Sequence, residues 1–357
     1  MRIVVAMSGG VDSSVAAGLL REAGHDVIGL SMQLYDQGDG HTSFGNCCTP
    51  ADLNDARKVA AHLGIPHYIL NLKQQFNEHV VKPFIAEYRN ARTPIPCVQC
   101  NGTLKFDTLV SRGHAFDASH VATGHYARVS TITDLNGQQQ YRLHRGVDRQ
   151  KDQSYYLFTL NQQQLAQASF PVGDLSKAEV RDYAHTLGLT TVADKPDSHE
   201  ICFVPDGKYA RFIEERHPGT DPAGKILSAD GNVVGRHQGV HRFTVGQRRG
   251  LGLSHSTPLY VTKLDAVRNT VTVGPREALE RTRLSASSMN WIESIPSRGS
   301  KVMAQVRSQH RPAEAVVLTT DENRLDIEFK EPQAIITPGQ AVVLYTEDIV
   351  LGGGWIN

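Results

Sequence analysis

The chain has 357 residues, more than one typical domain holds, so two or three domains are expected. It carries 37 basic and 37 acidic residues, so the whole chain lacks the positive field of a dedicated nucleic-acid-binding protein, and any such surface must be local. The apolar start at 3–7 is too short for a signal peptide, and no apolar run approaches the roughly 18 residues of a membrane-spanning helix. We therefore expect a cytoplasmic monomer with no membrane partner.

The first part of the chain, to about residue 200, alternates short apolar strands with helix-length amphipathic segments, which is typical of a parallel sheet covered on both faces. The expected strands are 3–7, 25–34, 67–72, 121–129 and 155–160, and the expected helices are 13–23, 52–63, 75–90, 104–111, 162–168 and 176–187. Gly24 and Gly64 each follow a helix where a left-handed residue commonly ends one. A basic loop is expected at 142–153. The pattern predicts a doubly wound α/β domain.

Beyond residue 205 the sequence pattern changes. Short strand-like runs are separated by glycines and by turn sequences such as Asp230-Gly231-Asn232. The expected strands are 239–246, 259–264, 301–306, 315–319, 325–329 and 341–345. We predict a catalytic α/β domain at 1–204, a small mixed, β-rich central domain at 205–281 and an all-β barrel or sandwich at 282–357. The central domain is mildly basic, with 12 Lys/Arg against 8 Asp/Glu, whereas the last has 7 against 9.

A glycine-rich loop follows the first expected strand and reads Ser8-Gly9-Gly10-Val11-Asp12-Ser13-Ser14. Strand, loop and helix in this order bring backbone N–H groups and a helix N-terminus together, which forms an anion site. The loop lacks the lysine of a Walker A motif, so it suits attack at the α-phosphorus of ATP while the loop holds pyrophosphate. It resembles the S-G-G-x-D-S loop of the N-type ATP pyrophosphatases, which implies adenylation of a substrate oxygen. The alternative is a glycine-rich turn that only caps a helix.

Five cysteines stand at 47, 48, 97, 100 and 202, an odd number that argues against a disulfide scaffold. Cys97 and Cys100 are expected in a proline-rich loop directly before a helix that starts near Asn101. A thiol at a helix N-terminus is a better nucleophile because the dipole favours the thiolate. Three interpretations compete for Cys97, Cys100 and Cys202: a metal or iron–sulfur site, a reactive pair for sulfur chemistry, or inert cysteines.

Six separated segments carry a more specific resemblance. They are the loop 8–14, TPIPCVQCN at 93–101 with KFD at 105–107, ATGHYAR at 122–128, KDQSYYL at 151–157, DSHEICF at 197–203 and GQRRGLG at 246–252. Together and in this order they resemble the bacterial tRNA-uridine 2-thiouridylase family. The resemblance runs from the N-terminus into the final domain.

The resemblance implies ATP-dependent transfer of sulfur to C2 of the wobble uridine of tRNA. It assigns the persulfide to Cys202 and the second catalytic thiol to Cys100, with a transient Cys100–Cys202 disulfide. Asp107 is a candidate acid, with a helix-surface carboxylate as the alternative. It also implies a cysteine desulfurase or sulfur-relay protein as donor, and tRNAs with Lys, Glu and Gln type anticodons.

The same resemblance assigns the binding residues. Those for ATP are Ala6, Met7, Ser8, Gly9, Gly10, Val11, Asp12, Ser13, Met32 and Gly124, with no protein metal cluster and Mg²⁺ entering with ATP against Asp12. Those for tRNA are Ile95, Pro96 and Cys97 at the target base, His125, Lys151, Asp152 and Gln153 elsewhere, and Arg307, Ser308 and Gln340 in the last domain. Family members commonly have an Arg-aromatic pair where this chain has Arg307-Ser308, which removes a stacking contact.

Three rival functions stay open. A pyrophosphate-loop amide ligase would need no paired cysteines. A non-catalytic tRNA-binding protein would not need Asp12 and both loop glycines, which this chain retains. An iron–sulfur thiolase would hold a cluster in place of the persulfide.

Overall fold

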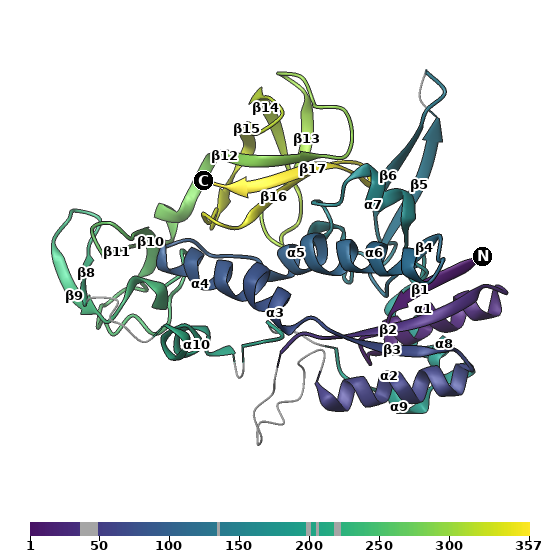
Figure 1. Ribbon diagram of the computed structural model, residues 1–357. Helices are drawn as coiled ribbons and strands as arrows, with labels where there is room; N and C mark the ends of the chain where they lie inside the picture. The colour runs from purple at the N-terminus through teal and green to yellow at the C-terminus, as the bar shows by residue number, and fades with distance from the viewer. Residues whose placement is uncertain (36–48, 134–135, 198–200, 205–206, 218–222) are drawn as a thin grey trace. The chain divides into compact units, whose positions relative to one another are not determined.

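The computed structural model covers residues 1–357 and describes all of them except 36–48, 134–135, 198–200, 205–206 and 218–222 (Figure 1). Cys47 and Cys48 lie outside the described residues. The chain groups into two compact units, of which the first comprises 1–80, 97–207 and 348–350 and the second 81–96, 208–347 and 351–357. The boundaries at 204 and 281 stay a prediction. None of the helices within the described ranges has the length and apolarity to cross a membrane.

A five-stranded parallel sheet forms the centre of the first unit, with the strand order β3-β2-β1-β4-β7. The strands are β1 (Arg2–Ala6), β2 (Asp26–Gln33), β3 (His67–Asn71), β4 (His120–Ala122) and β7 (Ala168–Ser169). Four helices share one core against this sheet: α1 (Val11–Glu22), α2 (Pro50–Leu63), α8 (Lys177–Thr186) and α9 (Thr190–Ala193). Helix α6 (Asp107–Ala115) contacts β1 and β4 outside that core. The predicted parallel α/β fold is confirmed.

Local sequence explains where several helices begin and end. Helix α2 starts at Thr49, whose hydroxyl accepts from the Asp52 N–H while the Asp52 carboxylate accepts from the Thr49 N–H, and it ends at Gly64 with φ 66°. Ser176 and Glu179 form the same reciprocal cap at the start of α8. These caps fix two helix N-termini that flank the glycine-rich loop.

Two expected helices are longer and less regular than predicted. The run expected at 75–90 consists of α3 (Lys73–Phe76), a π-helical turn (Asn77–Val81) and α4 (Lys82–Arg89), where Pro83 supplies no N–H. The run expected at 104–111 consists of α5 (Pro96–Gln99), a π-helical segment (Cys100–Phe106) and α6. The prediction that Cys97 and Cys100 lie in a loop is therefore wrong. Pro96 occupies the first turn of a helix, a position where proline is favoured.

Four strand assignments also differ from the prediction. The strand expected at 121–129 is split into β4 and β5 (Ala127–Thr133). The start of the expected basic loop, at 142–145, belongs to β6 (Gln139–Arg145), which pairs with β5. The strands expected at 155–160 and 239–246 instead contain 3₁₀ turns, at Ser154–Tyr156 and Val240–Arg242. The run at 155–160 is largely apolar and mostly buried. In such a run, the spacing of apolar residues does not distinguish a strand from a helical segment. Helix α7 (Gln162–Gln167) follows as expected.

The second unit contains a four-stranded sheet in the order β10-β11-β8-β9, together with α10 (Tyr209–Arg216). Its strands are β8 (Gly224–Leu227), β9 (Val233–His237), β10 (Tyr260–Asp265) and β11 (Thr270–Gly274). The predicted turn falls between β8 and β9, and Gly231 has φ 82° there. Buried apolar side chains such as Phe243, Val261 and Val271 form a separate core.

A closed six-stranded barrel completes the second unit, which confirms the predicted C-terminal barrel. Its strands are β12 (Glu280–Trp291), β13 (Lys301–Gln305), β14 (Ala313–Thr320), β15 (Arg324–Ala334), β16 (Ala341–Thr346) and β17 (Ile349–Ile356). Pairing of β12 with β17 closes the barrel, and closure leaves no open edge. The sequence analysis missed β17, since Gly352, Gly353 and Gly354 obscure its strand pattern.

Candidate active site

The glycine-rich loop connects the carboxyl end of β1 to the N-terminus of α1. Gly9 has φ 76°, and a Cβ there would lie 2.1 Å from the carbonyl oxygen of Asp52, so only glycine fits. The Ser13 hydroxyl lies 3.1 Å from the Ser8 backbone N and 3.1 Å from the Gly10 carbonyl oxygen. The loop is therefore folded by its own hydroxyls at the positive end of a 12-residue helix, as an anion site requires.

Asp12, in the first turn of α1, is bound by two groups from distant parts of the chain. Lys177 donates to both of its carboxylate oxygens, at 2.7 and 2.9 Å, and the Tyr126 hydroxyl donates to one, at 2.7 Å. Burial and the Asp12 carboxylate raise the pKa of Tyr126 well above its usual value, so the hydroxyl stays a donor. The loop therefore has a lysine beside it even though its own sequence contains none.

Asp197 links this lysine to the segment that leads to Cys202. Its carboxylate accepts from Lys177 at 2.8 Å and from Lys151 at 2.7 Å, with Arg181 at 3.4 Å. Burial opposes the charged form of Asp197, but the hydrogen bonds from Lys151 and Lys177 outweigh it and lower its pKa to about 2. Asp12, Lys177, Asp197 and Lys151 therefore form a continuous chain of ion pairs in which acidic and basic side chains alternate.

A second lysine holds the outer side of the loop. Lys195 donates to the carbonyl oxygen of Gly9 at 3.1 Å and to the carboxylates of Asp52 and Asp55 at 2.5 and 2.9 Å. Burial lowers the pKa of Lys195, but those two carboxylates outweigh it and raise the pKa overall. This ion cluster fixes Gly9 against the N-terminus of α2.

Two further residues assigned to ATP lie at carboxyl ends of neighbouring strands. Met32 is near the end of β2 and is 6% exposed. Gly124 follows β4, and a Cβ there would lie 2.5 Å from the backbone N of Ser13. The close approach explains the glycine, and it places the 123–126 turn directly against the loop. Ligands of open α/β sheets bind at this edge.

His125, next to Gly124, has a depressed pKa. Its Nδ1 lies 2.7 Å from the Thr123 hydroxyl, and its ring stacks on Phe106 at a centroid distance of 6.4 Å. Burial, together with the positive charge of Lys105, lowers the pKa of His125 from 6.5 to about 3. A contact from His125 to RNA would therefore use stacking or a neutral hydrogen bond, not a positive charge.

The residues predicted to contact tRNA at 151–153 have different roles in the structure. Lys151 forms an ion pair with Asp197, whereas Asp152 and Gln153 hold the backbone of the loop. Asp152 has a side chain that is 4% exposed and accepts from Arg145 at 2.6 Å and from two backbone N–H groups. Gln153 exchanges hydrogen bonds with the backbone of Tyr126, at 2.9 and 3.0 Å. Because the Tyr126 hydroxyl also donates to Asp12, hydrogen bonds through Tyr126 join the 151–153 loop to the glycine-rich loop.

The elements that carry Cys100 and Cys202 converge on α3. The π-helical segment that begins at Cys100 packs on α3, and the Phe76 ring of α3 lies 5.4 Å from the ring of Phe203. The carbonyl oxygen of Cys202 accepts from the Tyr35 hydroxyl at 2.6 Å. Both cysteines carry thiols, Cys100 buried and Cys202 half-buried, whereas the Cys97 thiol is exposed. The segments that carry the two predicted catalytic cysteines thus both contact α3, which follows the carboxyl end of β3.

Asp107 does not resemble an active-site acid. Its side chain is exposed at the start of α6 and accepts from the Gln164 amide of α7 at 2.7 Å. This contact joins two helices and fits the alternative interpretation, a surface carboxylate. Its assignment as an acid stays untested.

In the second unit, the segment around Gln340 is hydrogen-bonded to the segment that leads to Ile95 and Pro96. The Gln340 amide donates to the carbonyl oxygen of Thr93 at 3.0 Å, and the Thr93 N–H donates to Pro338 at 2.8 Å. Ile95 and Pro96, just beyond, are buried, so they offer little surface to a base. Arg307 and Ser308 form a turn on the barrel, where both carbonyl oxygens accept from the Gln305 amide.

The three parts of the chain match three family models. Residues 1–206 match a tRNA methyl transferase HUP domain, 210–275 a tRNA methyl transferase PRC-barrel domain, and 281–356 an aminomethyltransferase beta-barrel domain. The tRNA-specific 2-thiouridylase MnmA of Geotalea uraniireducens (strain Rf4) is 49% identical, with 100% of this chain and 95% of the relative covered. The chain belongs to the tRNA-specific 2-thiouridylase family. The MnmA of Geobacter metallireducens is 46% identical, covering 100% of this chain and 96% of the relative.

Among solved structures, a 4-thiouridine synthetase–RNA complex with bound ATP is 15% identical, covers 61% of this chain and 50% of that chain, and has a TM-score of 0.34. That likeness is too distant to bear on function. The resemblance to the thiouridylase family drawn from the six sequence segments is confirmed.

Four residues that were not among the predicted site residues contact the candidate site. Tyr126, Lys177, Lys195 and Asp197 bind the glycine-rich loop or its lysine. Tyr126 and Asp197 lie inside the ATGHYAR and DSHEICF segments, whereas Lys177 lies in an expected amphipathic helix and Lys195 follows α9 outside any of the six segments. In the described parts of the chain, no group of three or more His, Cys, Asp or Glu side chains is arranged to hold a metal.

Proposed function

We propose that this protein is an ATP-dependent tRNA-uridine 2-sulfurtransferase. Two observations support the proposal: the glycine-rich loop lies between the carboxyl end of β1 and the N-terminus of α1, and the segments of both cysteines contact α3. Membership of the tRNA-specific 2-thiouridylase family supports the substrate. An enzyme that acts on tRNA with ATP works where both are made, so we propose a cytoplasmic location.

In the first step, the C2 oxygen of the uridine attacks the α-phosphorus of ATP and pyrophosphate leaves, which gives an O-adenylated uridine. The loop N–H groups and the α1 N-terminus would hold the pyrophosphate, and Lys177 would add a positive charge. Asp12 is a suitable carboxylate for Mg²⁺, which binds through one or two carboxylates plus substrate phosphates and supplies charge neutralisation when bound. Lys177 would then exchange its Asp12 contact for phosphate oxygens.

In the second step, sulfur displaces AMP. The terminal sulfur of a Cys202 persulfide attacks C2, AMP leaves, and uridine is joined to Cys202 through a disulfide. The Cys100 thiolate then attacks the Cys202 sulfur, which releases 2-thiouridine and leaves a Cys100–Cys202 disulfide. A thiol reductant restores both thiols with two electrons. The alternative order has Cys100 attack first and release hydrosulfide, which then attacks C2.

The remaining assignments complete the proposal. Lys151, His125, Gln340 and the 95–97 segment would contact the tRNA, and Asp152 and Gln153 would hold the loop that presents Lys151. A cysteine desulfurase or relay protein would load Cys202, and tRNAs with Lys, Glu and Gln type anticodons would be the substrates. A monomeric state also stays a prediction.

The test is nucleoside mass spectrometry of unmodified tRNA after reaction with ATP, Mg²⁺ and a cysteine desulfurase with cysteine. We expect 2-thiouridine from the intact protein and none from Cys202→Ser or Cys100→Ser. Cys48→Ser is the matched control, because it makes the same substitution at a cysteine that has no step in the mechanism and no assigned contact with ATP or tRNA. Absence of 2-thiouridine from the intact protein would overturn the proposal, and full activity of Cys202→Ser would favour a ligase instead.

A further inference from the structure

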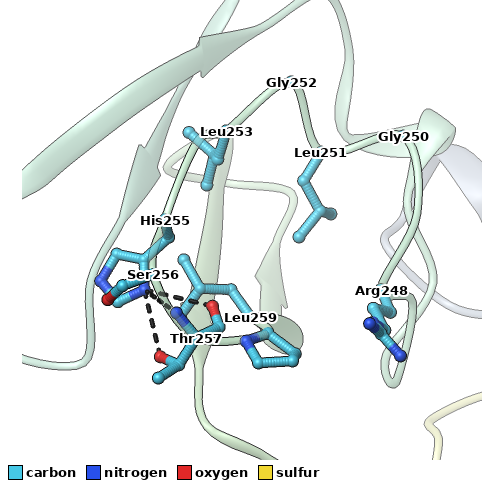
Figure 2. A pocket seen from close by; sticks show the side chains of 10 residues that line it. Arg248, Gly250, Leu251, Gly252, Leu253, His255, Ser256, Thr257 and Leu259 are labelled. Carbon is cyan, nitrogen blue, oxygen red and sulfur yellow. Dashed lines mark hydrogen bonds between the residues drawn. The ribbon is translucent and has the colours of Figure 1, made fainter.

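A loop in the second unit, which none of the steps above uses, lines an open pocket of about 450 Å³. The pocket is formed by residues 248, 250–253 and 255–259, which include the second half of the GQRRGLG segment (Figure 2). Figure 2 shows Arg248 on one side, His255 and Thr257 on the other, and Leu251 between them. The volume falls within the range of small-ligand sites.

The charge of this part of the chain is one-sided. Residues 231–264 contain five Arg or Lys and three His but no Asp or Glu. Arg242 is neutralised by Glu214 at 2.5 Å. Arg248 and Arg249 are exposed, and among the residues that the structure describes neither has a carboxylate partner. The pocket wall therefore presents positive charge that the protein itself does not compensate.

The pocket wall is also held in place from within. The Gln247 side chain accepts from the Thr244 N–H at 3.0 Å and donates to the Arg249 carbonyl at 2.9 Å. Leu251 is 8% exposed and packs in the core of the central sheet. Because its ends are fixed, the loop loses little conformational freedom when a ligand binds.

The backbone of the same loop suits an anion. Gly250 and Gly252 have φ 75° and 66°, so the loop turns through left-handed positions on both sides of Leu251. Turns of this kind gather N–H groups into concavities that bind phosphate oxygens. His255, whose Nδ1 lies 3.3 Å from the Thr257 backbone N, borders the same space.

We propose that this pocket binds a phosphodiester group of the tRNA backbone. The inference rests on the proposed function, because tRNA is the polyanion that the enzyme must hold. The Arg248 guanidinium would donate to phosphate oxygens and the loop N–H groups would add neutral donors. An open pocket with an exposed arginine suits a group within a continuing chain, whereas a free nucleotide is usually enclosed. The contact positions RNA and reads no sequence.

The test compares Arg248→Gln with Arg236→Gln, which removes the same charge from an exposed site on β9 outside the pocket. Dissociation constants for unmodified tRNA are measured over a range of KCl concentrations without ATP or a sulfur donor. We expect Arg248→Gln to weaken binding about tenfold at low salt and to lower the salt slope by about 1. Arg236→Gln should change neither, and Arg248→Lys should recover part of the affinity.

Hydrogen exchange on the unaltered protein gives an independent measurement. We expect tRNA to slow exchange at residues 248–259, and inorganic phosphate or AMP at millimolar concentration to have little effect. Identical tRNA binding by the Arg248→Gln and Arg236→Gln proteins would overturn the proposal. So would protection by phosphate or AMP but not by tRNA, since the site would then take a small anion. Failure of the proposed function is seen separately, as absence of 2-thiouridine from the intact protein.

Discussion

Lys177 donates to both carboxylate oxygens of Asp12, although 165 positions separate them in the chain. This contact places an ammonium group against the glycine-rich loop, which contains no lysine of its own. In P-loop enzymes a lysine inside the motif supplies that charge. Here the ammonium group comes from helix α8, and Asp12 and Asp197 hold it in place.

The first prediction concerns the charge of Lys177. Lys177→Met should reduce tRNA-dependent pyrophosphate release from ATP by about 100-fold, because a donor aimed at the developing charge is lost. The measurement is a steady-state pyrophosphate assay with unmodified tRNA. Lys58→Met, which changes an exposed lysine on α2, is the control and should retain the full rate. An unchanged rate in Lys177→Met would show that this ammonium does not act on the phosphates.

The second prediction separates the two loop glycines. Gly9→Ala should lower the free energy of unfolding by about 2 to 4 kcal/mol, because φ is 76° and the new Cβ would lie 2.1 Å from a carbonyl oxygen. Gly10 has φ −97°, and its nearest neighbour would be the Ser8 hydroxyl at 3.6 Å, so Gly10→Ala should fold normally. Urea denaturation of both variants measures this.

The same pair tests where phosphate approaches. If ATP lies against Gly10, the methyl group of Gly10→Ala should raise the KM for ATP without changing stability. Equal stability of the two variants would contradict the packing argument, and an unchanged KM in Gly10→Ala would place the phosphates elsewhere along the loop.

The sequence predicted the parts of the site that local patterns encode. The glycine-rich loop, its strand and its helix are contiguous, so their physics is contained in a few residues, and the structure has β1 and α1 where we expected them. Gly64 ended a helix as expected because only its own backbone conformation matters. The alternation of strands and helices likewise predicted the parallel sheet.

What the sequence did not predict depends on distant partners. Lys177 starts an amphipathic helix and Lys195 follows a short helix, and nothing in the sequence beside either lysine indicates that the fold brings it to Asp12 or Gly9. The helical setting of Cys97 and Cys100 was missed because Pro94 and Pro96 indicate a loop, although Pro96 starts a helix. The sequence around Tyr155 predicts a strand although the segment contains a 3₁₀ turn. Because most of its side chains are buried, polar and apolar residues do not alternate in a way that distinguishes a strand from a helical turn.

The third prediction separates adenylation from sulfur transfer. The loop and the cysteines lie on different elements, so Cys202→Ser should still release pyrophosphate from ATP in the presence of tRNA while forming no 2-thiouridine. Without sulfur to displace AMP, release should stop near one equivalent per enzyme–tRNA complex. A quench-flow pyrophosphate measurement checks this. Loss of that first equivalent in Cys202→Ser would mean that the persulfide cysteine also takes part in adenylation.

The fourth prediction uses the depressed pKa of His125. The His125 ring has a pKa of about 3 in the folded protein and near 6.5 in the unfolded chain. Between these pH values, the unfolded state therefore binds more protons than the folded state. Stability should therefore fall as pH decreases below 6.5, by at most about 1.4 kcal/mol per pH unit from this residue. His125→Gln cannot take up a proton, so its unfolding free energy should fall less steeply. Urea denaturation between pH 7 and pH 4.5 makes the comparison, and parallel pH profiles would show that His125 is not buried as a neutral ring.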